Sequence, residues 1–424
     1  MQHVGAAHDP FSLLHDQAGD VAAAHVLDDG ARLVGLATIV LFIATSINVG
    51  LMIAIGALVS RALGAHERER ARRLGGTTSA HMALAAILVT AVLLVLVPSI
   101  LQLLSASADT SAVAQRFLWI TLPSNVFLAL GMGFSGVLRA VGDATRAMYV
   151  TLSGAVVTVA LDPLLIFGFE LGTDGAAIAT VVSRCLFALV GFHGAVKIHD
   201  LVAWPRLNHF VADFRPMFAI AIPAVLTNVA TPIAGAFFAG VLARFGDGAI
   251  AGIAIVDRIV PVAFGGLFAL SGAIGPILGQ NWGARRFERM RQALRDGIVF
   301  LAVYVMLVWI LLLLIRWPLA GLFNATGVAA DIIGFFCLIS GPSWFFIGLL
   351  FLANASFNNL GFPLLSTLFN WGRATLGTIP FAVIGARFGP EGAFAGWGLG
   401  ASLFGAAAIW TAFWTIGRLE RRPA

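Results

Sequence analysis

The sequence contains few charged residues. Only 11% of its 424 residues are Asp, Glu, Lys or Arg, whereas 59% are hydrophobic and the mean hydropathy is +0.93. No water-soluble domain can bury so much apolar surface, so a soluble globular protein is excluded. Apolar runs of about 20 residues, the length that crosses a bilayer core, recur along the chain. Because these runs are continuously apolar rather than alternating, they indicate α-helices and not a membrane β-barrel.

The lack of nucleotide-binding, metal-binding and catalytic motifs excludes several classes of function. The chain has no Gly-x-x-x-x-Gly-Lys-Ser/Thr phosphate-binding loop, no metal-ligand cluster and no catalytic triad. A membrane-embedded acyl or glycosyl transferase would need clustered acid and base groups at a membrane face, and none is visible. We therefore expect no enzyme and no cofactor, so any active transport would draw on an ion gradient. Cys185 and Cys337 both lie inside predicted spans, which argues against a disulfide framework.

The apolar runs predict an all-α integral membrane protein, a polytopic bundle of about eleven transmembrane helices. The predicted helices cover residues 31–60, 81–104, 116–138, 148–169, 174–196, 216–242, 249–279, 296–316, 331–356, 363–386 and 393–417. Most arginines lie in alternate linkers and in the tail, at residues 61–73, 139–146, 197–215, 280–295 and 418–424. Since basic loops stay in the cytoplasm, these segments are expected to be cytoplasmic. The net charge of +5 then reflects topology, and no nucleic-acid partner is expected.

The chain contains two copies of one multi-helix unit. At a shift of 219, residues 57–73 match residues 276–292, and Gly64 falls on Gly283. Paired repeats of this kind place a substrate path between the halves and are common in transporters. The predicted domains are an N-lobe of five helices (31–197), a cytoplasmic linker (198–215), a C-lobe of six helices (216–417) and a basic cytoplasmic tail (418–424). The basic stretches after Gly64 and Gly283 are expected to form interfacial helices.

The N-lobe lacks one helix. The helix at 216–242 should have a counterpart near the start of the chain, but residues 1–30 form a polar segment with several histidines and aspartates. Each central acidic residue costs about 2.5–3.5 kcal/mol on insertion, so we expect this segment outside the membrane. A truncated or frame-shifted gene start is the preferred explanation. Real loss of the helix, or packing of the segment against the protein, remains open.

Asp162 is the first candidate for a functional side chain, because ionisable residues inside spans are rare and costly. Thr158 precedes it by one helical turn, and Pro163 removes a backbone donor directly after it. Thr180 on the following helix is predicted to lie at the same depth. A carboxylate with two hydroxyls suits a proton or a small cation such as Na⁺. The second repeat has Ile379 in place of Asp162, which favours function over a structural hydrogen bond.

Several further polar residues fall inside predicted spans. The candidates for lining a substrate cleft are Asp257, Arg258, Asn228, Asn354 and Arg184. For the adjacent pair Asp257 and Arg258, pairing of each with another helix is the favoured alternative. For the amides, including Asn358 and Asn370, the role of tying helices together is favoured. Arg373 is also expected to tie helices together.

These residues together resemble the multidrug and toxic compound extrusion (MATE) transporters. The matching motifs are Gly279–Ala284 (GQNWGA), Leu138–Asp143 (LRAVGD), Leu161–Ile166 (LDPLLI) and Gly175–Thr180 (GAAIAT). The resemblance implies twelve helices in two six-helix lobes around a central cleft. It also implies export of amphiphilic, often cationic compounds in exchange for H⁺ or Na⁺.

The family's functional positions transfer to particular residues of this chain. Asp162 falls on the family's acidic residue of helix five, Thr180 on its helix-six threonine, and Thr158 on a position that is often asparagine in one branch. Asp20 is a weak candidate for the helix-one aspartate. If the coupling ion is Na⁺, Asp162 and Thr180 would be its ligands.

The sequence therefore predicts a multi-pass antiporter of the bacterial inner membrane. It would act as a monomer among membrane lipids and would export amphiphilic, cationic drugs or toxic metabolites by alternating access, with H⁺ or Na⁺ as the coupling ion. Two alternatives remain at this point. One is a lipid-linked oligosaccharide flippase of the same superfamily, whose cavities often hold several arginines. The other is an inactive truncated transporter.

Overall fold

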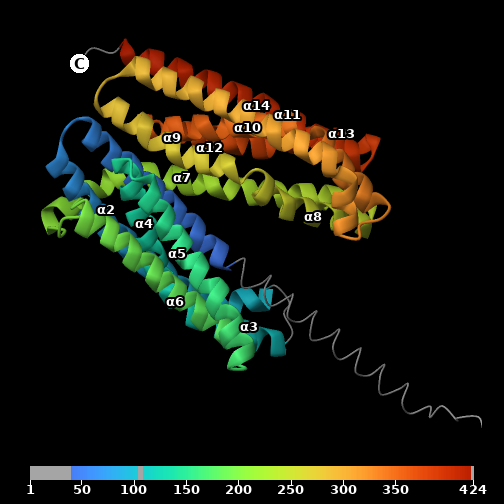
Figure 1. Cartoon of the computed structure of the whole chain (residues 1–424), viewed down its shortest axis with the longest axis horizontal. Helices are drawn as coiled ribbons and strands as arrows, with labels where there is room; N and C mark the ends of the chain where they lie inside the picture. The colour runs from blue at the N-terminus through green and yellow to red at the C-terminus, as the bar shows by residue number, and fades with distance from the viewer. Residues whose placement is uncertain (1–39, 104–107, 422–424) are drawn as a thin grey trace, which may run out of the picture. The chain divides into compact units, whose positions relative to one another are not determined.

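The computed structural model describes residues 40–103 and 108–421 (Figure 1). Every regular element within these ranges is a helix, so the all-α fold class is confirmed. The polar segment 1–30 and Asp20 lie outside the described residues. Cys185 and Cys337 are both free, as expected from their places inside helices.

The helices of the first repeat follow the predicted apolar runs. After the helix Val40–Gly64 come α2 (Arg68–Leu103), α3 (Ala108–Thr121), a 3₁₀ turn (Leu122–Ser124), α4 (Asn125–Val141), α5 (Ala144–Pro163) and α6 (Gly172–Phe192). Short π-helical segments extend α5 over Leu164–Gly168 and α6 over His193–Ile198.

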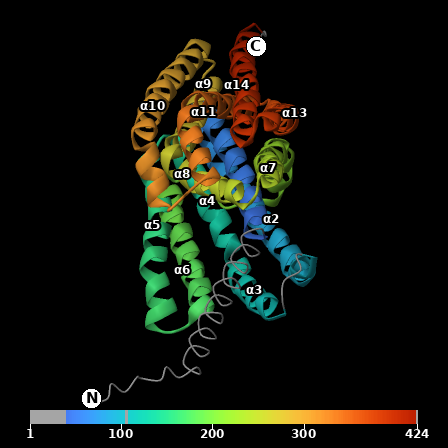
Figure 2. The same ribbon diagram turned by 90° about the vertical axis from the view of Figure 1, so that its right-hand side faces the viewer.

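The second repeat opens with a helix that has no counterpart among the described residues, and its later helices follow the order of the first repeat. Its elements are α7 (Leu207–Leu242), α8 (Asp247–Ala263), α9 (Gly265–Gly283), α10 (Phe287–Leu322), α11 (Val328–Leu360), α12 (Pro363–Gly372), α13 (Ile379–Gly385) and α14 (Pro390–Glu420). Helix α11 packs against α8, α9, α10, α12 and α14, and α7 packs against α12. Helix α7 also lies beside α13 (Figure 2). In α11 61% of the most apolar window is buried, against 17% in α10, so α11 is the central helix of this repeat.

The described residues contain nine helices long and apolar enough to cross a membrane, or ten if α8 and α9 form one span with a bend of 46°. The remaining predicted span, 363–386, is present in three pieces, because a π-helical segment at Arg373–Gly377 separates α12 from α13. The prediction of separate interfacial helices after Gly64 and Gly283 is wrong. Both basic stretches are the first turns of the 36-residue helices α2 and α10, whose backbones continue into the apolar runs.

The chain forms two compact units that do not coincide with the two sequence repeats. Of the described residues, the first unit contains 40–45, 85–103, 108–128 and 153–186, and the second unit contains 46–84, 129–152 and 187–421. The core of the first unit is a cluster of aliphatic side chains: Val40, Ala44, Leu93, Val97, Leu101, Ala114, Leu118 and Leu122. The second unit thus holds parts of both repeats, including the ends of several helices of the first.

Asp143 directly precedes α5 and follows Gly142, a glycine with a φ of +93°. Its carboxylate accepts a hydrogen bond of 3.0 Å from the Arg146 backbone N–H, contacts the Arg146 guanidinium, and lies 2.8 Å from His199 Nε2. Burial opposes ionisation, but these three hydrogen bonds outweigh it and lower the pKa of Asp143 from 3.8 to about 2. Asp143 therefore caps α5 and ties it to the linker before α7.

Replacement of Asp143 by Ala should destabilise the protein by about 1 kcal/mol at pH 7, because the N-cap is lost. A carboxyl group with a lowered pKa stabilises the fold above its ordinary value and loses this effect as the pH falls. The melting temperatures of wild type and variant should therefore converge between pH 3.8 and about 2. Glu288→Ala, at an exposed ion pair with Arg291, is the control and should change little. A constant difference across this pH range would contradict the assignment.

Candidate ion and substrate site

Asp162 lies in the last turn of α5 and is half-buried. Its Oδ1 atom is buried and has no hydrogen-bond partner among the described residues. Pro163 follows, and because proline has no N–H, the Val159 carbonyl loses its helical donor. The π-helical segment Leu164–Gly168 begins at the next residue, and such segments often mark functional sites. An unpaired carboxylate therefore sits where the helix backbone is already irregular.

The two threonines of the predicted ion site hydrogen-bond within their own helices. Thr158 Oγ1 donates to the Gly154 carbonyl at 3.1 Å, and Thr180 Oγ1 donates to the Ala176 carbonyl at 2.9 Å. No hydrogen bond joins either hydroxyl to Asp162 in the described part of the chain. Each hydroxyl oxygen keeps a lone pair, so both can still accept a proton or contact a cation.

Two close contacts set the register of α5 against α6. A Cβ atom at Gly175 would lie 2.8 Å from the Leu165 carbonyl oxygen, and Ser183 Oγ donates to the Gly154 carbonyl at 2.8 Å. Between these contacts, Thr180 lies nearer the level of Thr158 than that of Asp162. The predicted equal depth of Asp162 and Thr180 is thus shifted by about 4–5 Å, or three residues of helix.

The corresponding region of the second repeat contains no carboxylate. Ile379 takes the place of Asp162, and Trp397, in the place of Thr180, has its ring centroid 6.0 Å from that of Phe238. Thr375 Oγ1 donates to the Trp371 carbonyl at 2.7 Å, as Thr158 does to its own helix. The two repeats share a backbone arrangement, but only the first has a carboxylate here.

Arg184, a predicted cleft residue, is held by the protein. Its Nη1 atom donates to the Thr121 carbonyl and to Ser124 Oγ, both at 3.0 Å. These acceptors lie in the 3₁₀ turn between α3 and α4 and in the residue before it. The contacts favour a role in tying α6 to this turn. Arg373 is similar, since it is buried and its Nη2 donates to Thr231 of α7 at 3.1 Å.

The amides of the second repeat form a buried network between α11 and α12. Asn370 Nδ2 donates to Asn354 Oδ1 at 3.0 Å, and Ser366 Oγ donates to Asn358 Oδ1 at 3.2 Å. Asn228 instead donates to the carbonyl one turn earlier in α7. This geometry agrees with amides that join helices, as is common in membranes.

Asp257 and Arg258 are both exposed on α8. Neither side chain forms an ion pair or a hydrogen bond within the described residues, so the favoured alternative, pairing with another helix, is not seen there. Both therefore remain candidates for contact with a substrate. No group of three or more His, Cys, Asp or Glu side chains that could hold a metal ion occurs in the described chain.

Sequence reasoning missed a reciprocal contact between the two repeats, which lies within the second unit. A Cβ atom at Gly64 would lie 1.9 Å from the Gln280 carbonyl oxygen, and one at Gly283 would lie 2.1 Å from the Arg61 carbonyl oxygen. Arg61 and Gln280 correspond at the shift of 219, as do the two glycines. The repeats therefore approach each other backbone to backbone around a local two-fold relation.

Side chains complete this contact, which we name the Gly64–Gly283 junction (Ser60, Arg61 and Gly64 with Gly279, Gln280 and Gly283). Arg61 Nη2 donates to the Asn358 carbonyl at 2.8 Å, and Gln280 Nε2 donates to the Ala140 carbonyl at 2.6 Å. Ser60 Oγ donates to Asn359 Oδ1 at 3.5 Å. The repeated Gly-Ala dipeptides were the sequence signal for this junction, although they do not show that the copies meet.

Comparison with known proteins agrees with this architecture. The MatE family model matches residues 33–164 and 223–384. The chain is 31% identical over 256 residues to the FAD transporter of Shewanella oneidensis, which is 59% of this chain and 56% of that protein. It is 26% identical over 307 residues to the multidrug export protein MepA of Staphylococcus aureus, which is 70% of this chain and 67% of that protein.

The fold matches solved transporter structures over most of its length. A point mutant of the Vibrio cholerae MATE transporter VcmN is 28% identical with a TM-score of 0.87, covering 92% of this chain and 89% of that chain. The chain spans between 56% and 58% of the length of the first two curated relatives that it matches. Because the family model covers well over half of the sequence, the chain belongs to the MATE family of multi-pass membrane transporters.

Proposed function

We propose that this protein is an ion-coupled antiporter of the bacterial inner membrane that exports amphiphilic, cationic small molecules by alternating access. The observation that carries the proposal is the buried Oδ1 of Asp162 beside Pro163, which has no hydrogen-bond partner in the described part of the chain. The relative MepA is named a multidrug export protein, which supports export of small molecules. The protein would act as a monomer and use H⁺ or Na⁺ as its coupling ion, without a cofactor.

The coupling step follows from the environment of Asp162. A carboxylate without a partner in a low-dielectric environment is costly, so it gains stability when it binds a proton or a cation. The π-helical segment after Pro163 lacks regular helical hydrogen bonds, which lets α5 bend at low cost. Binding of the ion at Asp162 would then favour one conformation of α5, and release of the ion would favour the other. Thr158 and Thr180 would supply hydroxyl oxygens to the bound ion.

The Gly64–Gly283 junction supports alternating access. It joins the two repeats at helix ends that lie at the start of the basic segments 61–73 and 280–295, and since basic loops tend to stay in the cytoplasm we expect it at the cytoplasmic side. Close approach of the repeats there would seal the cytoplasmic end of a path between them. Because only a few side-chain hydrogen bonds hold the junction, it can open and close at modest cost. A substrate would enter from the cytoplasm when the junction is open.

Two observations bear on the other candidates. Arg184 and Arg373 are held by backbone and hydroxyl groups of the protein, which leaves few arginines for a flippase of lipid-linked oligosaccharides. An anionic flavin nucleotide is a second substrate class, since one relative is named an FAD transporter and Arg258 is exposed on α8 without a partner among the described residues. Export assays with a cationic dye and with FAD would separate the two.

Asp162→Asn should abolish ion-driven export, because the amide cannot bind or release a proton and holds a cation weakly. We expect at least a tenfold loss of dye export from proteoliposomes under an imposed pH or Na⁺ gradient, with unchanged membrane insertion. Asp174→Asn is the matched control, since Asp174 is ion-paired with Arg116 in the first turn of α6. Full coupling in the Asp162 variant would refute the assignment.

Cross-linking of the junction should stop transport. A Cβ atom at Gly279 would lie 3.0 Å from Ser60 Cβ, close to the 3.5–4.5 Å spacing of a disulfide. Ser60→Cys with Gly279→Cys, in a background with Cys185→Ala and Cys337→Ala, should lose export on oxidation and regain it on reduction. Each single cysteine variant serves as the control. Unchanged export by the oxidised double variant would contradict a gate at this place.

A further inference from the structure

An open groove of about 1250 Å³ lies where α2 and α7 begin, within the second unit. Its walls are the first turns of α2 and the linker that precedes α7. The residues that line it are His66, Glu67, Arg68, Glu69, Arg70, Arg72, Arg73, Ala203, Trp204, Arg206 and His209. We call it the arginine groove. It has no part in the ion site or in the Gly64–Gly283 junction.

Two adjacent glycines of α2 hold the linker in place. A Cβ atom at Gly75 would lie 2.0 Å from the Leu201 carbonyl oxygen, and one at Gly76 would lie 1.8 Å from the Ala203 carbonyl oxygen. The Ala203 N–H also donates to the Arg72 carbonyl at 3.0 Å. The linker therefore runs directly along α2, which brings the residues after Ala203 beside the arginines of α2. The groove is built by backbone packing.

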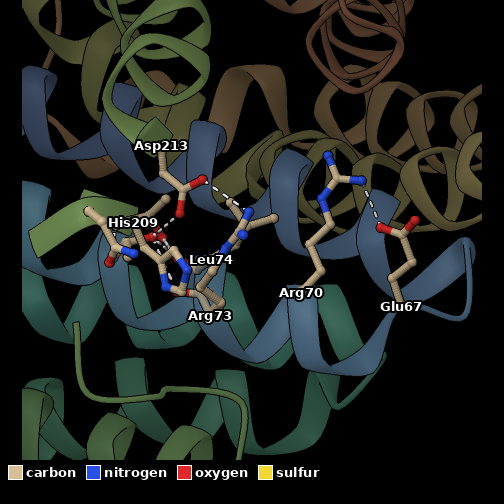
Figure 3. Close-up of polar contacts among 9 residues, drawn as sticks. Glu67, Arg70, Arg73, Leu74, His209 and Asp213 are labelled. Atoms are coloured by element: carbon tan, nitrogen blue, oxygen red, sulfur yellow. Dashed lines mark hydrogen bonds and ion pairs between the residues drawn. The ribbon is translucent and has the colours of Figure 1, made fainter. Parts of the chain in front are cut away.

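Three of the five arginines are paired with carboxylates. Arg73 lies 3.2 Å from the buried Asp213, which also accepts a hydrogen bond of 2.8 Å from Thr77 (Figure 3). Arg70 lies 2.7 Å from Glu67, as Figure 3 also shows. The third pair joins Arg72 to the exposed Asp200 at 3.0 Å.

The other two arginines have no carboxylate partner among the described residues. Arg68 donates to the His199 carbonyl at 2.8 Å, and Arg206 precedes the first turn of α7. Glu69 is the remaining acidic group of the lining. The five arginines of the lining face four carboxylates, Glu67 and Glu69 of the lining and the partners Asp200 and Asp213, so the groove has a surplus of one positive charge. The N-termini of α2 and α7 add partial positive charge at the same place. The groove therefore favours an anion.

An apolar stripe adjoins the charged wall. Trp204 is 91% exposed, Leu207 is 79% exposed and Val211 is 66% exposed, and Phe214 continues the stripe along α7. Leu207, Val211 and Phe214 are spaced by four and three residues, so they share one face of the helix. Exposure of such an apolar face to water is unfavourable. Tryptophan and aliphatic side chains are common where a protein meets the edge of a bilayer.

We propose that the arginine groove is a binding site for an anionic phospholipid of the surrounding membrane. The lipid phosphate would contact Arg68 and Arg206, and the acyl chains would lie along Trp204, Leu207 and Val211. The combination of an anion site with an adjoining apolar stripe distinguishes a lipid from a free phosphate, which would use only the arginines. A zwitterionic lipid would gain less, because its headgroup carries no net charge.

Native mass spectrometry of the full-length protein with phosphatidylglycerol or phosphatidylcholine would test the site. Wild type should retain phosphatidylglycerol in preference to phosphatidylcholine. Arg68→Gln with Arg206→Gln should weaken phosphatidylglycerol retention by roughly 25-fold, since each arginine near an anionic headgroup contributes about fivefold. Trp204→Ser should weaken it without any change of charge. Sodium phosphate at millimolar concentration should not displace the lipid.

The control is Arg285→Gln with Arg286→Gln, at the corresponding basic segment before α10. It removes the same charge and should retain phosphatidylglycerol within about twofold of wild type. Equal loss in the control, unchanged retention in the groove variant, or displacement by phosphate would each overturn the proposal. A melting temperature close to that of wild type shows that a variant is folded.

Discussion

The free-energy cost of an unpaired charge in hydrocarbon determines how the polar side chains inside the spans are arranged. The bilayer offers no water to solvate a buried guanidinium or carboxylate, so each polar side chain inside a span needs a protein partner. Arg184 and the amides of α11 and α12 have such partners, and Arg373 has one at Nη2, although its Nε has none among the described residues. Asp162 Oδ1 has none among the described residues, although it lies within α5. The same rule that makes the paired groups structural supports our proposal that this carboxylate binds the coupling ion.

Small residues allow close backbone contact where helices of different repeats meet. At Gly64 and Gly283 any side chain would overlap a carbonyl group of the opposite repeat, so these positions allow direct backbone contact. The duplication explains why the contact is reciprocal, since corresponding residues of the two copies contact each other. The arginine groove uses Gly75 and Gly76 in the same way, although there the contact is between a helix and a linker.

The apolar runs allowed prediction of nearly every helix, because a span needs a continuous stretch of about 20 apolar residues. Helix ends were less predictable. The span expected from residue 81 belongs to a helix that begins at Arg68, since helical turns outside the hydrocarbon need not be apolar. The break after Gly372 was also missed, because a π-helical turn changes backbone hydrogen bonding without an apolar signal of its own. Asp162 became a candidate because it lies in an apolar run. For Arg184 and Asn354, composition could not distinguish lining of a cleft from the joining of helices.

The sequence by itself determined the membrane as the solvent, the approximate number of spans and the duplication, because these depend on composition, run length and self-similarity. Only the tertiary structure decided which polar groups are paired, at what level Thr180 meets α5, and that the two Gly-Ala turns contact each other. Those outcomes depend on the rotation and depth of each helix against its neighbours. Side-chain packing sets both quantities, and spacing along one chain does not encode them.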